Sequence, residues 1–153
     1  MAKKIFILIL LIISLYSCGF APINNNYSNL DYNIIIDKTE GDTTTNNAVK
    51  AKLEAFNLND FDNKLIVNLK SEYQKVSVGK DAKGNTSDYR LSINCVFFLQ
   101  ISGKKKELSI NKHFIMKKLN QNFQQQQYEN EIRNNLTQLI VDELIFEINL
   151  FLK

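Results

Sequence analysis

The sequence has few of the residues that interrupt regular structure or build common catalytic sites. One proline and five glycines in 153 residues argue against long linkers and collagen-like repeats. There is no tryptophan, and there are two cysteines and a single histidine, His113. Their positions in the sequence do not suggest a Ser-His-Asp or Cys-His catalytic set. One histidine and two cysteines are also too few ligands for a zinc site. We therefore expect no enzymatic activity, no catalytic residues and no metal site.

Motifs for nucleotide or phosphate chemistry are also missing. No glycine-rich phosphate loop or dinucleotide fingerprint occurs. Ser102-Gly103-Lys104-Lys105 matches the Ser-x-x-Lys string, but it lies in a predicted hairpin turn and not at the start of a helix. A periplasmic hydrolase, one alternative function, would need a catalytic set that the sequence does not supply.

The first 17 residues have the layout of an export signal. Lys3 and Lys4 form a positive start, and an unbroken apolar run follows over 5–13. That run is too short to span about 30 Å of hydrocarbon as a permanent helix. The segment Leu15-Tyr16-Ser17-Cys18 then resembles a lipobox, in which cleavage before the cysteine leaves it with a diacylglycerol thioether and an acylated amino group. The alternative is an ordinary cleaved signal with an incidental cysteine.

Lipidation of Cys18 would determine where the protein resides. Each buried methylene contributes about 0.8 kcal/mol, so two or three acyl chains make release negligible. Gly19 follows, where lipoproteins retained at the inner membrane commonly have Asp, so we expect the periplasmic face of the outer membrane. Cys95 would then be the remaining thiol, without an intramolecular disulfide partner, and its apolar surroundings predict a core residue.

The rest of the chain predicts a polar lipidated tether over 18–29 and a single domain over 30–153. Alternating apolar residues predict strands near 30–36, 65–78, 89–101 and 108–116, and a five-residue hairpin turn over 102–106. Apolar residues at helical spacing predict helices near 43–56 and 124–152, with Leu139 widening the stripe of the second. The last three turns of that helix are apolar nearly all round, which predicts burial on more than one side. The expected fold is α+β, a four-stranded mixed sheet with two helices packed on one face, in the order β-α-β-β-β-α.

Charge is unevenly distributed along the mature chain. Segment 18–63 has a net charge of −4, segment 64–118 of +8 and segment 119–153 of −3. The three later strands are thus a basic block between acidic segments. Lysines and arginines make strong contacts with phosphate, and lipid headgroups are the anionic partners expected in the periplasm, rather than nucleic acid. The lipopolysaccharide-binding candidates by charge and loop position are Lys80, Lys83, Arg90, Lys104, Lys105 and Lys106. Alternatively, these residues only prevent pairing between sheet edges.

The start of the mature chain resembles a known family. Cys18-Gly19-Phe20-Ala21-Pro22 is similar to the opening of LptE, the lipopolysaccharide-assembly lipoprotein, where Cys-Gly-Phe-x-Pro directly follows the lipobox. The size, the order of elements and the long terminal helix are also similar.

The resemblance implies a function and partners. LptE-like proteins plug the lumen of the LptD β-barrel in the outer membrane, assist its assembly and bind lipopolysaccharide through basic residues. The acidic segments would then face other parts of that complex. The alternative is an auxiliary periplasmic lipoprotein of an ABC-type lipid transporter, which would carry ligand and not occupy a barrel.

Overall fold

The computed structural model describes residues 32–57 and 61–152. In chain order the elements are β1 (Asn33–Gly41), α2 (Thr43–Glu54), β2 (Lys64–Lys80), β3 (Thr86–Ile101), β4 (Lys104–Lys117) and α3 (Asn122–Leu152). The predicted order of strands and helices is therefore confirmed. The signal segment 1–17, Cys18 and the tether 18–29 lie outside the described residues.

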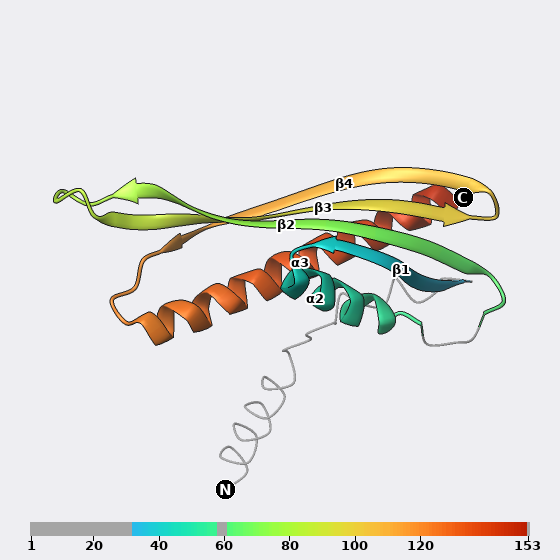
Figure 1. The fold of residues 1–153 in the computed structure, drawn as a ribbon, viewed down its shortest axis with the longest axis horizontal. Coiled ribbons are helices and arrows are strands. Elements are labelled where there is room, and N and C mark those ends of the chain that lie inside the picture. Colours follow the sequence, from blue (N-terminus) through green and yellow to red (C-terminus); the bar gives the residue numbers. More distant parts are fainter. Residues whose placement is uncertain (1–31, 58–60, 153) are drawn as a thin grey trace, which may run out of the picture.

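The four strands form one mixed sheet in the order β1-β2-β3-β4. β1 runs parallel to β2, while β2, β3 and β4 form an antiparallel meander. A parallel neighbour requires a crossover connection, and α2 supplies it. Both helices lie beneath the same face of the sheet, with α2 under β1 and α3 running under β3 and β4 (Figure 1). The predicted fold class is confirmed, and no described element covers the other face of the sheet.

The core lies between this sheet and the helices. Along β3, every second residue points toward the helices and is buried. These residues are Leu91, Ile93, Cys95, Phe97, Leu99 and Ile101, as the alternation predicted. Ile132, Leu136, Ile140, Leu144 and Ile148 of α3 and Val49 and Leu53 of α2 are buried against them.

The junction between β1 and α2 depends on two adjacent residues. Asp42 caps α2, because its carboxylate accepts a hydrogen bond of 2.8 Å from the Thr45 amide. Gly41 has a φ of +91°, and a Cβ built there would lie 1.8 Å from the Ser71 carbonyl oxygen. Only glycine therefore fits at the end of β1, where it lies against Ser71 of the neighbouring strand β2. Phe56, predicted on the α2 stripe, lies beyond the end of the helix but packs against the core.

The β3–β4 connection is shorter than predicted. Ser102 and Gly103 have φ values of 47° and 83°, the double positive φ of a two-residue type I′ turn. Such a turn follows the natural twist of the strands, so pairing begins at once between Ile101 and Lys104. Residues 104–106 thus belong to β4, and the predicted five-residue turn is wrong.

The outer face of α3 also differs from the prediction. Leu139, Phe146 and Leu150 are 53%, 53% and 50% exposed, so the last turns are not buried on more than one side. The sheet and α2 together cover only part of the helix circumference, and no other described element packs on its outer side. Within the described ranges, no helix combines the length and apolarity needed to cross a bilayer.

Candidate functional site

The basic candidate residues lie at two opposite ends of the sheet. Lys80, Lys83 and Arg90 are at or near the β2–β3 turn, whereas Lys104 follows the β3–β4 turn. β3 has 16 residues between these turns, which at about 3.3 Å per residue separates them by roughly 50 Å. The structure therefore does not bring the six candidates into one site.

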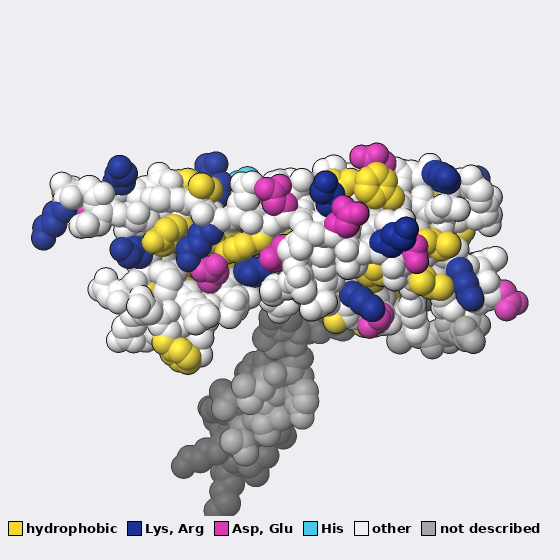
Figure 2. Space-filling model, viewed as in Figure 1, with side chains coloured by type: hydrophobic (Ala, Val, Ile, Leu, Met, Phe, Trp, Pro, Cys, Tyr) yellow, Lys and Arg dark blue, Asp and Glu magenta, His cyan; other side chains and the backbone are white. Residues whose placement is uncertain are grey.

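The β2–β3 end gathers more positive charge than the candidate list contained. Lys117 pairs with Asp88 in the β3–β4 register, and the Lys118 amide donates to the Ser87 carbonyl at 2.8 Å. We call the resulting group the hairpin end; its basic residues are Lys80, Lys83, Arg90, Lys117 and Lys118, all exposed. Lysine and arginine side chains are visible over this end in Figure 2. Sequence reasoning counted Lys117 and Lys118 in the basic block but could not place them, because their position depends on strand register.

Exposed apolar side chains lie among these charges. Val76, Arg90 and Ile115 are direct neighbours across β2, β3 and β4, on the sheet face that the helices do not cover. Val76 is 48% and Ile115 is 54% exposed, and Val78 is also exposed. A guanidinium between two exposed aliphatic side chains offers a charged contact and an apolar contact within one row of the sheet.

The β2–β3 turn is held in shape by Asp81. Its carboxylate accepts hydrogen bonds from the Asn85 side chain, from the Asn85 amide and from the Lys83 amide. The side-chain and backbone hydrogen bonds of Asn85, and to a smaller extent the Lys118 charge, lower the pKa of Asp81 below its ordinary value. Beside this turn is an open hollow of about 460 Å³, lined by Asp81, Asn85, Thr86, Ser87, Asp88, Lys117, Lys118 and Asn120. The ammonium groups of Lys117 and Lys118 can bind an anionic headgroup at the rim of this hollow.

The opposite end has fewer available cations. Lys106 forms an ion pair of 2.8 Å with Glu147 of α3, and its ammonium lies 5.9 Å from the centre of the Phe151 ring. Lys106 is therefore engaged in an intramolecular contact. Lys104 and Lys105 remain exposed.

The acidic terminal helix faces the basic strands of the same molecule. Glu129 pairs with Lys75 at 2.5 Å, and Glu143 pairs with Lys112 at 2.5 Å, in addition to the pair at Glu147. Opposite charges thus meet across the contact between α3 and the sheet, and these three acids are paired within the molecule. Each partly exposed pair contributes less than about 1 kcal/mol.

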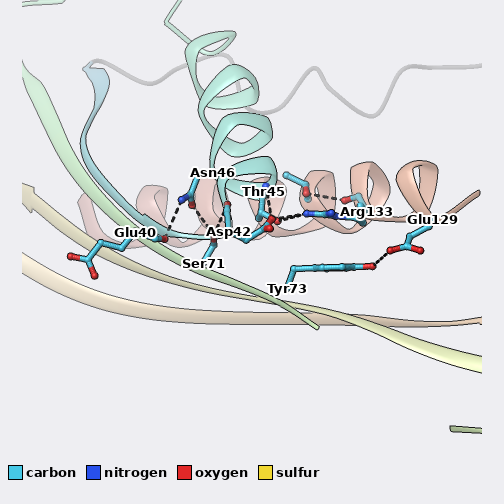
Figure 3. A network of polar contacts seen from close by, with 9 residues as sticks. Glu40, Asp42, Thr45, Asn46, Ser71, Tyr73, Glu129 and Arg133 are labelled. Atoms are coloured by element: carbon cyan, nitrogen blue, oxygen red, sulfur yellow. Dashed lines mark hydrogen bonds and ion pairs between the residues drawn. The ribbon is translucent and has the colours of Figure 1, made fainter. Parts of the chain in front are cut away.

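A polar network fixes α3 to β2 and to the start of α2 (Figure 3). Arg133 donates to the Asp42 carboxylate at 2.6 Å, and its guanidinium lies over the Tyr73 ring. The Tyr73 hydroxyl donates to Glu129 at 2.5 Å, and Glu129 also accepts from Lys75. This network holds the inner half of the long β2–β3 hairpin against α3, and sequence reasoning did not find it because its members are far apart in the chain.

The network changes the pKa of its acids. Burial raises the pKa of Asp42, but hydrogen bonds from Thr45 and the Arg133 charge outweigh it and leave the pKa below its ordinary value. For Glu129, burial is likewise outweighed by hydrogen bonds from Lys75 and Tyr73. Burial and the neighbouring Glu129 carboxylate raise the pKa of Tyr73.

The residues considered for catalysis lie apart from one another. His113 is exposed on the uncovered face and pairs with Ser92 in the register, as predicted for a surface strand residue. Cys95 is buried in the core as predicted, and burial raises the pKa of its thiol to about 12. Among residues 32–57 and 61–152, no group of three or more His, Cys, Asp or Glu side chains could hold a metal ion.

Comparison with known proteins finds similarity at the level of structure. No family model matches the chain. No curated protein matches it either. The rare lipoprotein B from Shewanella oneidensis superposes with a TM-score of 0.53 at 14% identity, over 74% of this chain and 98% of that one. A minor lipoprotein from Acinetobacter baumannii gives 0.51 at 15% identity, over 77% and 96%. The uncharacterized lipoprotein B from Nitrosomonas europaea gives 0.55 at 11% identity, over 79% and 86%. The chain therefore shares its fold with several solved lipoproteins.

Proposed function

We propose that this protein is a non-catalytic lipoprotein of the outer membrane, anchored at its periplasmic face through lipidated Cys18. In this proposal it binds lipopolysaccharide and assists an LptD-like β-barrel. The lipobox-like segment before Cys18 supports the anchor, and the fold shared with solved lipoproteins agrees with it. No cofactor is needed beyond the acyl and diacylglycerol groups on Cys18.

The observation that carries the lipid-binding part is the composition of the hairpin end. Phosphorylated glycolipids combine anionic groups with acyl chains, and a ligand of that kind needs cations and apolar surface in one place. At the hairpin end, Arg90 stands between Val76 and Ile115, with Lys80 and Lys83 at the turn. The hairpin also extends beyond α2, so it can reach into a barrel lumen, whose interior is polar (Figure 1).

The two ends of the sheet allow a matched test of lipopolysaccharide binding. Lys80→Glu with Lys83→Glu changes the hairpin end, while Lys104→Glu with Lys105→Glu makes the same charge change at the opposite end. A charge-assisted contact to phosphate contributes about 1.5–3 kcal/mol, so we expect the first pair to weaken lipopolysaccharide binding at least about tenfold. We expect the second pair to change it less than about twofold, since its effect is limited to long-range charge. Titration of the purified proteins with lipopolysaccharide measures both, and equal losses in the two pairs would contradict a site at the hairpin end.

The barrel partner is tested by affinity purification of the lipidated protein from membranes in mild detergent. A stoichiometric complex with a large outer-membrane barrel supports the proposal. Recovery of an inner-membrane transporter instead would favour the auxiliary-lipoprotein alternative.

A further inference from the structure

The outer face of α3 changes character along the helix. In its first half, Phe123 in the opening turn is exposed, and the other exposed residues are polar: Asn122, Gln124, Gln126, Gln127, Asn130, Glu131, Asn134 and Asn135. In its second half Leu139, Phe146 and Leu150 are half exposed, and their spacing places them on one side of the helix. We call these three residues the apolar stripe. Such a stripe on the polar surface of a helix is typical of contact with a membrane interface or another protein.

The apolar stripe lies toward the end of the molecule where the described chain begins. The register runs from Asn33 to Lys64 and from Ile66 to Gln100, so β1 starts at the same sheet end as the β3–β4 turn. The ion pair between Lys106 and Glu147 places the C-terminal half of α3 beside the start of β4. Figure 1 shows the start of β1, the β3–β4 turn and the C-terminal end of α3 at one end, with the β2–β3 turn at the other.

An anchor at Cys18 would hold this end of the molecule near the bilayer. Cys18 precedes Tyr32, the first described residue, by a segment that spans at most about 50 Å when fully extended. With that anchor, the apolar stripe would meet the membrane surface at the high effective concentration that a short tether provides. A stable dimer through the same face would need about 800 Å² per partner, much more than three half-exposed side chains offer.

Two of the acidic residues near the apolar stripe are paired with lysines of the sheet. Glu143 and Glu147 are neutralised by their lysine partners, and Asp142 accepts a hydrogen bond from Gln138. Lys104 is exposed and points to the same side of the sheet as Lys106, next to the C-terminal half of α3.

We propose that the apolar stripe of α3 lies in the headgroup region of an anionic bilayer while the lipoprotein is anchored and not bound to a partner protein. This inference rests on the proposed lipid anchor. In this orientation the polar half of α3 and the hairpin end point away from the membrane. The lipid-binding residues are then presented to ligands and partners arriving from the aqueous side.

Because the chain contains no tryptophan, one introduced tryptophan reports its own depth in the membrane. The test uses the lipidated full-length protein with Phe146→Trp, bound to vesicles of phosphatidylethanolamine and phosphatidylglycerol with brominated acyl chains. The matched control is Phe123→Trp, at the polar end of the same helix, where the side chain is 70% exposed. We expect emission to fall about twofold or more for Phe146→Trp and less than about 10% for Phe123→Trp, since an interfacial helix buries its apolar face about 5–10 Å deep.

Similar quenching at both positions, or none at position 146, would overturn the docked orientation. Leu150→Trp repeats the measurement if Phe146→Trp does not fold. Unquenched emission from position 146 that shifts with protein concentration would assign the apolar stripe to a second copy of the chain. Sedimentation of the wild-type protein with the vesicles, and its loss in Cys18→Ser, tests the anchor separately, so failure of the anchor and failure of the docking give different results.

Discussion

The guanidinium carbon of Arg133 lies 3.9 Å from the centre of the Tyr73 ring, while the same guanidinium donates to Asp42 at 2.6 Å. A single side chain of α3 therefore contacts the middle of β2 and the cap of α2. Arginine suits this position because its planar group can stack on an aromatic ring and donate in its own plane.

Arg133→Ala should destabilise the fold by about 2 kcal/mol, since it removes a charge-assisted hydrogen bond and the stacking on Tyr73. Arg133→Lys keeps the charge but not the planar group, and we expect a loss of about 1 kcal/mol. Urea unfolding followed by far-ultraviolet circular dichroism measures both changes. Equal losses in the two variants would mean that charge is irrelevant at this position.

Stability should fall in acid because of Asp42 and Glu129. Both have pKa values in the fold below their ordinary values of 3.8 and 4.5, so the folded state binds protons less readily than the unfolded chain. Their contribution is therefore full above the ordinary values and is lost as the pH falls through the lowered ones. Asp42→Asn with Glu129→Gln should lower stability at neutral pH and flatten its dependence on pH below about 5. An unchanged slope would mean that other carboxyl groups control acid unfolding.

Gly41→Ala should destabilise the protein by about 2–4 kcal/mol, because the new methyl group overlaps the backbone of Ser71 and the positive φ is unfavourable. Gly103→Ala is the control, since its φ is also positive but nothing lies within 4 Å of the added carbon. There we expect about 1 kcal/mol, from backbone strain alone. Urea midpoints of the two variants separate steric overlap from strain.

Phe97→Ala should cost about 3–5 kcal/mol, because Phe97 is fully buried in the middle of β3. Phe98→Ala, one residue along on the uncovered face and 43% exposed, should cost much less. Thermal unfolding of the pair measures the difference directly. A loss below about 1 kcal/mol for Phe97→Ala would contradict its place in the core.

The fold could be predicted from the sequence where periodicity is strong. Alternation from Leu91 to Ile101 identified β3 and its buried face, and residues four apart from Ile132 to Ile148 identified the core side of α3. Leu139, Phe146 and Leu150 were assigned to the interior because apolar character alone does not tell how many neighbouring layers a helix has. That number depends on the whole fold.

The candidate site was only partly predictable. Charge and turn position identified Lys80, Lys83 and Arg90 at the hairpin end. The addition of Lys117, and the pairing of Lys106 with Glu147, required the β3–β4 register and the position of α3. A sequence pattern records which residues are charged, but an ion pair between distant segments is decided by tertiary packing. The link through Arg133 was missed for the same reason.

The parallel pairing of β1 has a consequence for the order of folding. β2, β3 and β4 are joined by short turns, so their contacts close small loops, whereas β1 reaches β2 only after α2 and its connections are in place. Closing the longer loop costs more chain entropy. We therefore expect the meander and α3 to form first and β1 to join last. Any chaperone or translocation factor holding the amino-terminal segment after export would then leave an early nucleus of three strands and one helix free to assemble.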